Sequence, residues 1–186
     1  MPDFPLAHQR APNSSPRMSR GKLPVVTHLT RAYEPHDRAD VVDLSLRAWA
    51  PVHDSMRQVM GDEIFDLHHQ PDWRTCQRND VEAVLSDEKA KIWVAVEGDA
   101  VIGFAAAITH LDELMGEVTM IAVDPDHQNR GLGTELTNRA TDWLREAGMT
   151  HAVISTGGDI GHAPARRTYE KAGYRPFPGV NYFKAL

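Results

Sequence analysis

The fold is decided by the stretch Val123-Asp124-Pro125-Asp126-His127-Gln128-Asn129-Arg130-Gly131-Leu132-Gly133-Thr134. Apolar residues before it predict a strand over residues 116–123, and apolar residues at steps of three and four after it predict an amphipathic helix over residues 128–147. Gly131 and Gly133 thus stand where the first backbone amides of a helix lack partners. Such a start favours an anion, above all a pyrophosphate, although a purely structural helix start would explain the same Gly-x-Gly.

Two common phosphate-binding loops do not match this stretch. The dinucleotide-binding fingerprint requires a third glycine where this chain has Leu136. The Walker loop requires Gly-Lys-Ser/Thr, which does not follow Gly133. A different class of phosphate-binding turn is therefore indicated.

Outward from this turn, the pattern alternates between the periods of strands and helices. The elements that it predicts, in chain order, are a strand over 26–33, a helix over 37–50 that Pro51 ends, one or two short helices within 52–88, a β-hairpin of strands 91–96 and 101–108, the strand 116–123, the helix 128–147, a strand over 151–155, a helix over 163–172, and two short strands over 174–177 and 181–186. This order predicts a mixed α/β fold in a single domain.

Length and composition limit the class of protein. The 186 residues, of which 41% are hydrophobic and 25% charged, suit one globular domain. A net charge of −6 argues against a nucleic-acid partner, and no apolar run approaches the roughly 18 residues of a membrane-spanning helix. The single cysteine, Cys76, cannot form an internal disulfide, and no cysteine–histidine cluster indicates zinc. We expect a cytoplasmic monomer or homodimer without a secretion signal, a metal or a membrane partner.

The N-terminal residues differ from the rest of the chain. Residues 1–23 are rich in proline and carry four basic residues against one acidic residue. They predict a disordered tail before a domain over residues 24–186, with Met18 as a plausible true start. A basic docking arm is the alternative interpretation of the same residues.

Two motifs together resemble the GNAT superfamily, the GCN5-related N-acetyltransferases. Gln128-Asn129-Arg130-Gly131-Leu132-Gly133 behind Val123-Asp124-Pro125 is similar to the acetyl-CoA loop of the family, which reads Arg/Gln-x-x-Gly-x-Gly/Ala. Ala165-Arg166-Arg167-Thr168-Tyr169-Glu170-Lys171-Ala172-Gly173-Tyr174 resembles its second motif, A-x-x-L-Y-x-K-x-G-F/Y. The resemblance covers about residues 26–186. It implies a central, mostly antiparallel sheet with one splayed strand pair, flanked by helices.

The resemblance also implies how acetyl-CoA, the co-substrate, would bind. The backbone of Ile121, Ala122 and Val123 would pair with the pantetheine arm and polarise the thioester carbonyl. The turn would hold the pyrophosphate, and the residues implied there are Gln128, Asn129, Arg130, Gly131, Leu132, Gly133 and Thr134. His162 stands where the family usually has an asparagine on the coenzyme side, which implies coenzyme contact; a proton acceptor and a plain histidine at a helix start are the alternatives for His162. The implied reaction is acetyl transfer to a primary amine by direct attack.

Two residues are the candidates for proton transfer. Tyr169 matches the general acid of the family, and a phenol with a pKa near ~10 stays protonated at neutral pH and can donate to a departing thiolate. The alternative is a half-buried aromatic residue on an amphipathic helix. Glu117 is the candidate base, often acting through water in the family, and strand alternation predicts that it shares a face with Thr119, Ile121 and Val123. A solvated strand carboxylate is the alternative for Glu117.

Other residues carry weaker hypotheses. Gly157 stands where ribosomal-protein acetyltransferases of the family have a glutamate, so that subtype is not favoured, and Asp159 is either a second acid or a helix cap. Acylation of Cys76 lacks a neighbouring base, and His68-His69 with Asp66 and Asp72 is read as a solvated loop.

The acceptor is the least determined part of the function. In this family the segment over about residues 49–73 would form the wall of the acceptor pocket, and its acidic residues suggest a cationic small-molecule amine: a polyamine, an amino sugar or an amino acid. A solvated acidic loop explains them equally well. The alternative function is a sensor or scaffold that binds coenzyme A without transfer.

Overall fold

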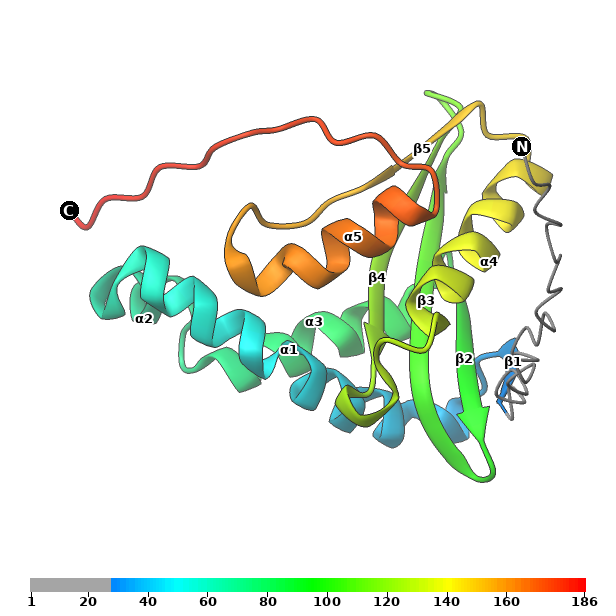
Figure 1. Cartoon of the computed structure of the whole chain (residues 1–186), viewed down its shortest axis with the longest axis horizontal. Coiled ribbons are helices and arrows are strands. Elements are labelled where there is room, and N and C mark those ends of the chain that lie inside the picture. The colour runs from blue at the N-terminus through cyan, green and yellow to red at the C-terminus, as the bar shows by residue number, and fades with distance from the viewer. Residues whose placement is uncertain (1–27) are drawn as a thin grey trace, which may run out of the picture.

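The computed structural model describes residues 28–186 as one mixed α/β domain. Its strands are β1 (Leu29–Ala32), β2 (Lys91–Glu97), β3 (Ala100–His110), β4 (Met115–Val123) and β5 (His151–Ile154). Its helices are α1 (Arg38–Met60), α2 (Asp62–His68), α3 (Trp73–Ser86), α4 (Leu132–Glu146) and α5 (Ala163–Lys171), with 3-10 turns η1 (Pro35–Asp37), η2 (Pro125–His127) and η3 (Ile160–His162) (Figure 1). The predicted tail over 1–23 and Met18 lie outside the described residues.

The sheet has the strand order β1-β2-β3-β4-β5, and only the β4–β5 pair is parallel. One face packs on α1 and α3 through a core that includes Val42, Leu44 and Phe104. The other face packs on α4 through Leu136, Ala140 and Leu144. Burial on both faces explains why β2 and β3 are continuous apolar runs rather than alternating ones. Each fully buried leucine here contributes roughly 1.5–3 kcal/mol.

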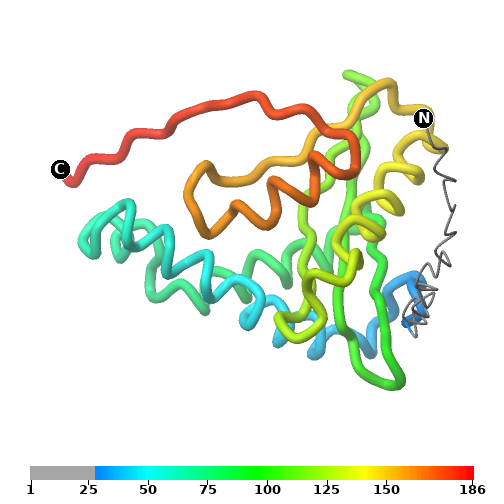
Figure 2. The backbone as a smooth tube through the Cα atoms, viewed as in Figure 1, coloured from blue at the N-terminus to red at the C-terminus, as the bar shows by residue number. Residues whose placement is uncertain are grey.

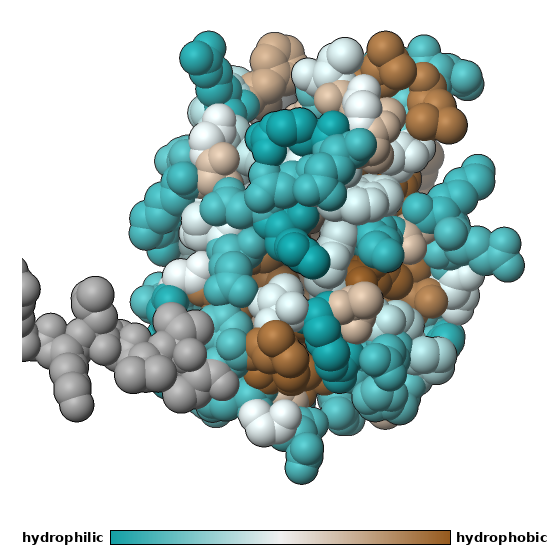
Figure 3. Space-filling view, turned by 90° about the vertical axis from the view of Figure 1, so that its right-hand side faces the viewer, coloured by the Kyte–Doolittle hydropathy of each residue, from teal (hydrophilic) through white to brown (hydrophobic). Residues whose placement is uncertain are grey.

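Helix α4 is amphipathic because one of its sides packs on the sheet and the other faces solvent. Its inward residues Leu132, Leu136, Ala140 and Leu144 are almost completely buried. Seen from the side of α4 and β1, the surface is largely hydrophilic, with small separate hydrophobic patches (Figure 3). The predicted helix over 128–147 is therefore confirmed, although it begins later, at Leu132.

The splayed strand pair is present between β4 and β5. The two strands pair only from Met115 with His151 to Val118 with Ile154. Beyond this pairing the chain after β5 diverges from β4 and leads to α5 (Figure 2). The last residues of β4 therefore have a strand neighbour, β3, on one side only.

The prediction that Pro51 ends the first helix is wrong. Helix α1 continues through Pro51 to Met60. A proline inside a helix removes a hydrogen bond and costs about 3 kcal/mol. Burial on both sides of it offsets this cost, since Val41, Val42 and Leu44 precede it in the core and His53 and Ser55 follow it there.

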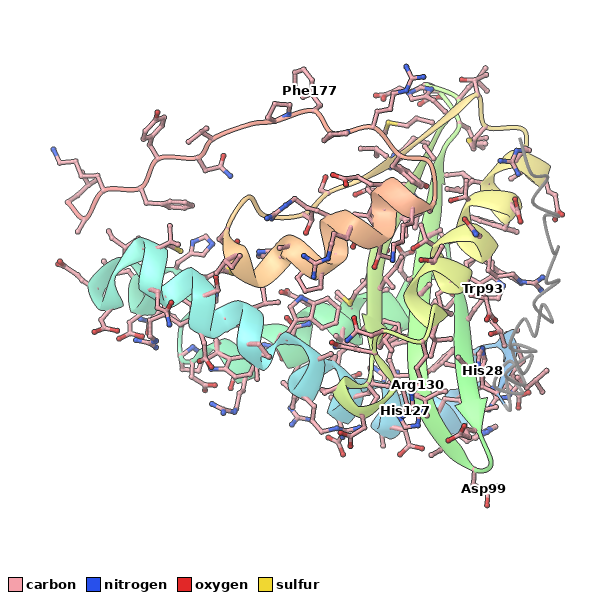
Figure 4. The ribbon with its side chains drawn as sticks, in the orientation of Figure 1. His28, Trp93, Asp99, His127, Arg130 and Phe177 are labelled. Atoms are coloured by element: carbon pink, nitrogen blue, oxygen red, sulfur yellow. The ribbon has the colours of Figure 1, made fainter. Side chains whose placement is uncertain are left out.

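The two C-terminal strands predicted over 174–177 and 181–186 are also wrong. Residues 174–186 form neither strand nor helix and run past α5 without joining the sheet (Figure 2). Tyr174 anchors the start of this segment, because its hydroxyl lies 2.8 Å from Thr141 Oγ1. Pro176 and Pro178 cannot donate to a sheet ladder, and Phe177 points into solvent, 97% exposed (Figure 4).

Candidate active site

A cleft of about 310 Å³ opens where β4 and β5 separate. It is bounded by the end of β4, the turn after β4, helix α5, the middle of α1 and Gly161 of η3. The residues that line it are Ala48, Trp49, Pro51, Ile121, Ala122, Val123, Gln128, Asn129, Gly131, Gly133, Thr134, Gly161, Pro164, Ala165, Arg167, Thr168, Tyr169 and Lys171. The structure thus brings together most of the predicted coenzyme residues and Tyr169. Arg130, Leu132, His162 and Glu117 do not line the cleft.

The turn between β4 and α4 is held by Asp124, which is 8% exposed. Its carboxylate accepts hydrogen bonds from the Asp126 backbone amide at 3.0 Å and from the Arg47 guanidinium at 2.7 Å. Burial alone would raise the pKa of Asp124, but the bonds from Arg47, Asp126 and His127 outweigh it and lower the pKa. An ionised carboxylate therefore ties the turn to α1.

The start of α4 exposes backbone amides to the cleft. Gly131 has a φ of 89° in the left-handed region, which only glycine adopts without strain, and it has no side chain to cap the helix. A β-carbon at Gly133 would stand 3.3 Å from Thr168 Cγ2 of α5, so the two helices approach closely there. Leu132 lies in the core, so only its backbone could contact a ligand. This cradle of free amides at a helix N-terminus fits an anionic group.

Arg130 and Gln128 have local partners in this structure. Arg130 donates to the carbonyl of Asp126 at 2.9 Å and lies beside His127 below α4 (Figure 4). Gln128 donates to the carbonyl of Val123 at 3.1 Å and lines the cleft. Both side chains therefore stiffen the turn, and Arg130 would have to rotate to reach a phosphate.

Tyr169 projects from α5 into the cleft. Burial raises the pKa of its phenol to about 12, with a smaller effect from Tyr174. Its hydroxyl makes no hydrogen bond to any other residue between 28 and 186. Tyr169 is therefore a protonated donor without an internal partner.

The predicted face of Glu117 is wrong because β4 contains a bulge. Ala106 pairs with Met120 and Ala107 pairs with Val118, so one extra residue, Thr119, interrupts the alternation. Glu117 therefore shares a face with Met120 and Ala122, toward α1, and not with Ile121 and Val123, which pack toward α4. Its carboxylate lies 2.9 Å from His110 Nε2.

His162 ends η3 and is bonded to Asp159 rather than open to the cleft. Its Nδ1 contacts Asp159 Oδ1, and the other carboxylate oxygen of Asp159 accepts from Ser55 Oγ at 2.5 Å and from the Gly161 amide at 3.0 Å. Asp159 therefore caps η3, as one of its two hypotheses predicted. Direct coenzyme contact by His162 is not supported by this placement.

Several residues that line the cleft were not predicted from the sequence. Lys171, Thr168 and Arg167 of α5 line it beside Tyr169, and their spacing on one helix was a usable signal. The α1 wall is formed by Ala48, Trp49 and Pro51, whereas the acidic residues expected there do not line the cleft. Two of those carboxylates, Asp62 and Asp66, pair with Arg57 instead.

The solvated loop expected at Asp66, His68, His69 and Asp72 is wrong, because Asp66 and His68 lie in α2 and His69 is buried. These residues instead have structural roles. Asp72 caps α3 through the Arg74 and Thr75 amides, and His69 Nδ1 bonds to the carbonyl of Phe65. Cys76 Sγ lies 3.3 Å from the carbonyl of Gln70 and outside the cleft. Between residues 28 and 186, no group of three potential ligand side chains could hold a metal ion. Over the same range, no helix combines the length and apolar character that crossing a membrane requires.

Comparison with known proteins places this architecture in a family. The sequence profile of the acetyltransferase (GNAT) family matches residues 53–174. The splayed sheet and the glycine cradle define a protein of the acetyltransferase fold, and the chain belongs to the GNAT family.

Particular relatives agree with this assignment. The chain is 32% identical over 148 residues to the mycothiol acetyltransferase of Actinosynnema mirum, covering 77% of this chain and 43% of that protein. It spans less than half the length of the mycothiol acetyltransferases that it matches. Two solved structures share the fold. One is aminoglycoside 6'-N-acetyltransferase AAC(6')-Ig from Acinetobacter haemolyticus, with a TM-score of 0.60 and 15% identity over 85% of this chain and 98% of that chain. The other is PaiA N-acetyltransferase from Thermoplasma acidophilum in complex with coenzyme A, with a TM-score of 0.59 and 12% identity over 78% of this chain and 89% of that chain.

Proposed function

We propose that the protein transfers the acetyl group of acetyl-CoA to a primary amine of a small molecule by direct attack. The observation that carries the proposal is the cleft in which Tyr169 faces the unpaired end of β4 and the glycine cradle of α4. Membership of the GNAT family, which uses acetyl-CoA, supports the choice of co-substrate. A protein that only bound the coenzyme would not need an unbonded phenol at this place.

The chain offers three kinds of contact to acetyl-CoA. The amides at the start of α4 suit the pyrophosphate, because they are free and carry the positive end of the helix dipole. The backbone of Ile121 to Val123, unpaired on the β5 side, suits the amide-bearing pantetheine arm. Lys171 also lines a second hollow beside α4, together with Arg139, and places a cation beside the cradle for a further phosphate.

Tyr169 is proposed as the general acid. Attack of a neutral amine on the thioester forms a C–N bond, and collapse of the tetrahedral intermediate breaks the C–S bond. The departing thiolate takes the phenolic proton, and the tyrosinate then takes the surplus proton of the new amide nitrogen. A phenol held protonated by burial is suited to this exchange.

Glu117 remains a candidate acceptor for the proton of the incoming ammonium. The bulge in β4 places it on the α1 face of the sheet, on the same side as Trp49 and Pro51. Because Glu117 does not line the cleft, it would act through water.

The acceptor is proposed to be an amine on an amino sugar or a similar small polar molecule. Two names among the compared proteins, mycothiol acetyltransferase and aminoglycoside 6'-N-acetyltransferase, point to such substrates. The α1 side of the cleft is formed by Ala48, Trp49 and Pro51, which offer contact area rather than charge. Localisation in the cytoplasm, where acetyl-CoA is available, belongs to the same proposal.

A thiol-release assay with acetyl-CoA across amino sugars, polyamines and amino acids tests the proposal. Release of coenzyme A that depends on one class of amine, with the acetylated product seen by mass spectrometry, supports it. Tight binding of acetyl-CoA by calorimetry without release for any amine would instead support the sensor function.

A further inference from the structure

The loop between β5 and α5 contains a carboxylate–imidazole pair that the proposed coenzyme contacts do not use. His162 Nδ1 is bonded to Asp159 Oδ1. Asp159 Oδ2 is occupied by Ser55 Oγ at 2.5 Å and by the Gly161 amide at 3.0 Å. The carboxylate is thus held on three sides, by α1, by η3 and by the imidazole.

The pair fixes the tautomer of the imidazole. A carboxylate that bonds to Nδ1 accepts the proton carried there, so the lone pair is left on Nε2. Burial would raise the pKa of Asp159, but the bonds from Ser55 and His162 outweigh it and lower the pKa, so the carboxylate is charged. His162 Nε2 makes no hydrogen bond to the other described residues. This is the arrangement of an imidazole prepared to accept a proton.

The loop between β5 and α5 holds the imidazole ring of His162 beside the cleft. A β-carbon at Gly157 would collide with His162 Nδ1 and stand 2.6 Å from Asp159 Oδ1, so a larger residue there would displace the pair. Gly161, next to His162 in the chain, lines the cleft, as do Pro164 and Ala165 just after it. The Arg166 guanidinium donates to the carbonyls of Gly157 and Asp159 at 2.5 and 2.8 Å and closes the loop around the ring.

Asp159 is the charged partner of His162, because the other titratable groups around the ring are neutral or bonded elsewhere. His53 of α1 faces it, and burial lowers the pKa of His53 to about 4, so His53 is neutral at physiological pH. The Arg166 guanidinium of α5 is engaged by two backbone carbonyls of the loop. Ser55, the α1 residue that bonds to Asp159, is uncharged.

We propose that His162 Nε2 accepts the proton of the incoming ammonium through water, since the ring does not itself line the cleft, with Asp159 as its positioning residue. This inference rests on the proposed function and names its proton acceptor in place of Glu117. The ammonium N–H bond breaks, its proton passes through water to Nε2, and the freed lone pair attacks the thioester carbon. His162 then releases that proton to solvent, while Tyr169 supplies and recovers its own proton as described above. One proton leaves per acetyl group transferred, as the overall reaction requires.

The test compares His162→Gln and Asp159→Asn with His36→Gln, an exposed histidine remote from the cleft. With the best amine from the panel, kcat of His162→Gln should fall by roughly 10² to 10⁴ at neutral pH. The loss should shrink as the pH approaches the pKa of the amine, near ~10.4 for an alkyl amine, because free amine then needs no acceptor. Asp159→Asn should show the same pH-dependent pattern, and His36→Gln should not.

A second readout separates proton transfer from a structural role. Added imidazole should restore part of the turnover of His162→Ala, while the affinity of each variant for acetyl-CoA by calorimetry stays near the unmodified value. Equal losses at all pH values, or no rescue by imidazole, would overturn the inference while acetylation by the unmodified protein keeps the proposed function intact. If His162→Ala does not fold, the pH profile of Asp159→Asn decides. Absence of acetylation by the unmodified protein overturns both.

Discussion

Gly133 of α4 and Thr168 of α5 lie so close that a β-carbon at position 133 would stand 3.3 Å from Thr168 Cγ2. The two helices therefore meet where α4 begins, and α5 carries Tyr169 past the free amides of that helix start. The neighbouring Gly131 has open space around it and a φ of 89°. Gly133 thus permits close packing of α4 on α5, and Gly131 permits the turn before α4.

Replacement of Gly131 by aspartate should abolish binding of acetyl-CoA. The carboxylate would place negative charge and bulk where the pyrophosphate is proposed to bind. Gly98→Asp is the matched control, since Gly98 also has a positive φ of 61° and open space but lies in the β2–β3 turn. Calorimetry on both folded variants should show loss of affinity for Gly131→Asp alone. Unchanged affinity in Gly131→Asp would contradict the cradle.

Tyr169→Phe should reduce turnover by roughly 10² to 10⁴ with little change in coenzyme affinity. The substitution keeps the ring and its packing and removes only the proton donor. Tyr182→Phe, at an exposed position, is the control. Steady-state rates with the amine identified in the panel measure the effect. A wild-type rate with chemistry rate-limiting would show that the thiolate takes its proton from elsewhere.

Glu117→Gln separates the two candidate proton acceptors. If His162 accepts the proton, Glu117→Gln should lower kcat at neutral pH by much less than His162→Gln does, because the Glu117 carboxylate is engaged by His110 whereas His162 Nε2 makes no hydrogen bond to the other described residues. Rates of both variants between pH 6 and about 10 compare them over the range in which an alkyl ammonium deprotonates. The reverse order of losses would assign the acceptor to Glu117.

Asp37→Asn should destabilise the fold and flatten its acid dependence. Asp37 is 2% exposed and accepts two bonds of 2.7 Å from Arg31, and the bond from Arg31 is the main reason that its pKa is lowered. A lowered carboxyl pKa contributes stability that is fully present above the unfolded value, near ~3.9, and is lost as the pH falls through the folded value. We expect a loss of roughly 1–3 kcal/mol at neutral pH that shrinks on acidification.

Urea unfolding between pH 7 and 3 checks this prediction. The control is Asp99→Asn at the tip of the β2–β3 turn (Figure 4), which takes no part in the Arg31–Asp37 pair. A destabilisation of Asp37→Asn that stays constant on acidification would show that packing, not charge, is the contribution of Asp37.

Local patterns predicted most of the elements because their periods are set by residues close in the chain. The hairpin of β2 and β3, strand β4, and helices α4 and α5 were all predicted near their observed positions. The two wrong element predictions, the helix end at Pro51 and the C-terminal strands, lie where contacts between distant segments determine the secondary structure. Pro51 remains helical because α1 is buried on both sides of it, and the C-terminal residues have strand-like composition but no neighbouring strand to pair with.

The sequence by itself determined the family, the glycine turn that is proposed to bind an anion and the position of Tyr169 on a helix, because glycine conformations and helical spacing are local properties. The tertiary structure decided which groups meet. The bulge at Thr119 turned Glu117 to the α1 face, and the contact of Ser55 with Asp159, across 104 positions of the chain, positioned the carboxylate behind His162. Such pairings depend on strand register and on helices packed from distant segments, and no local pattern encodes them.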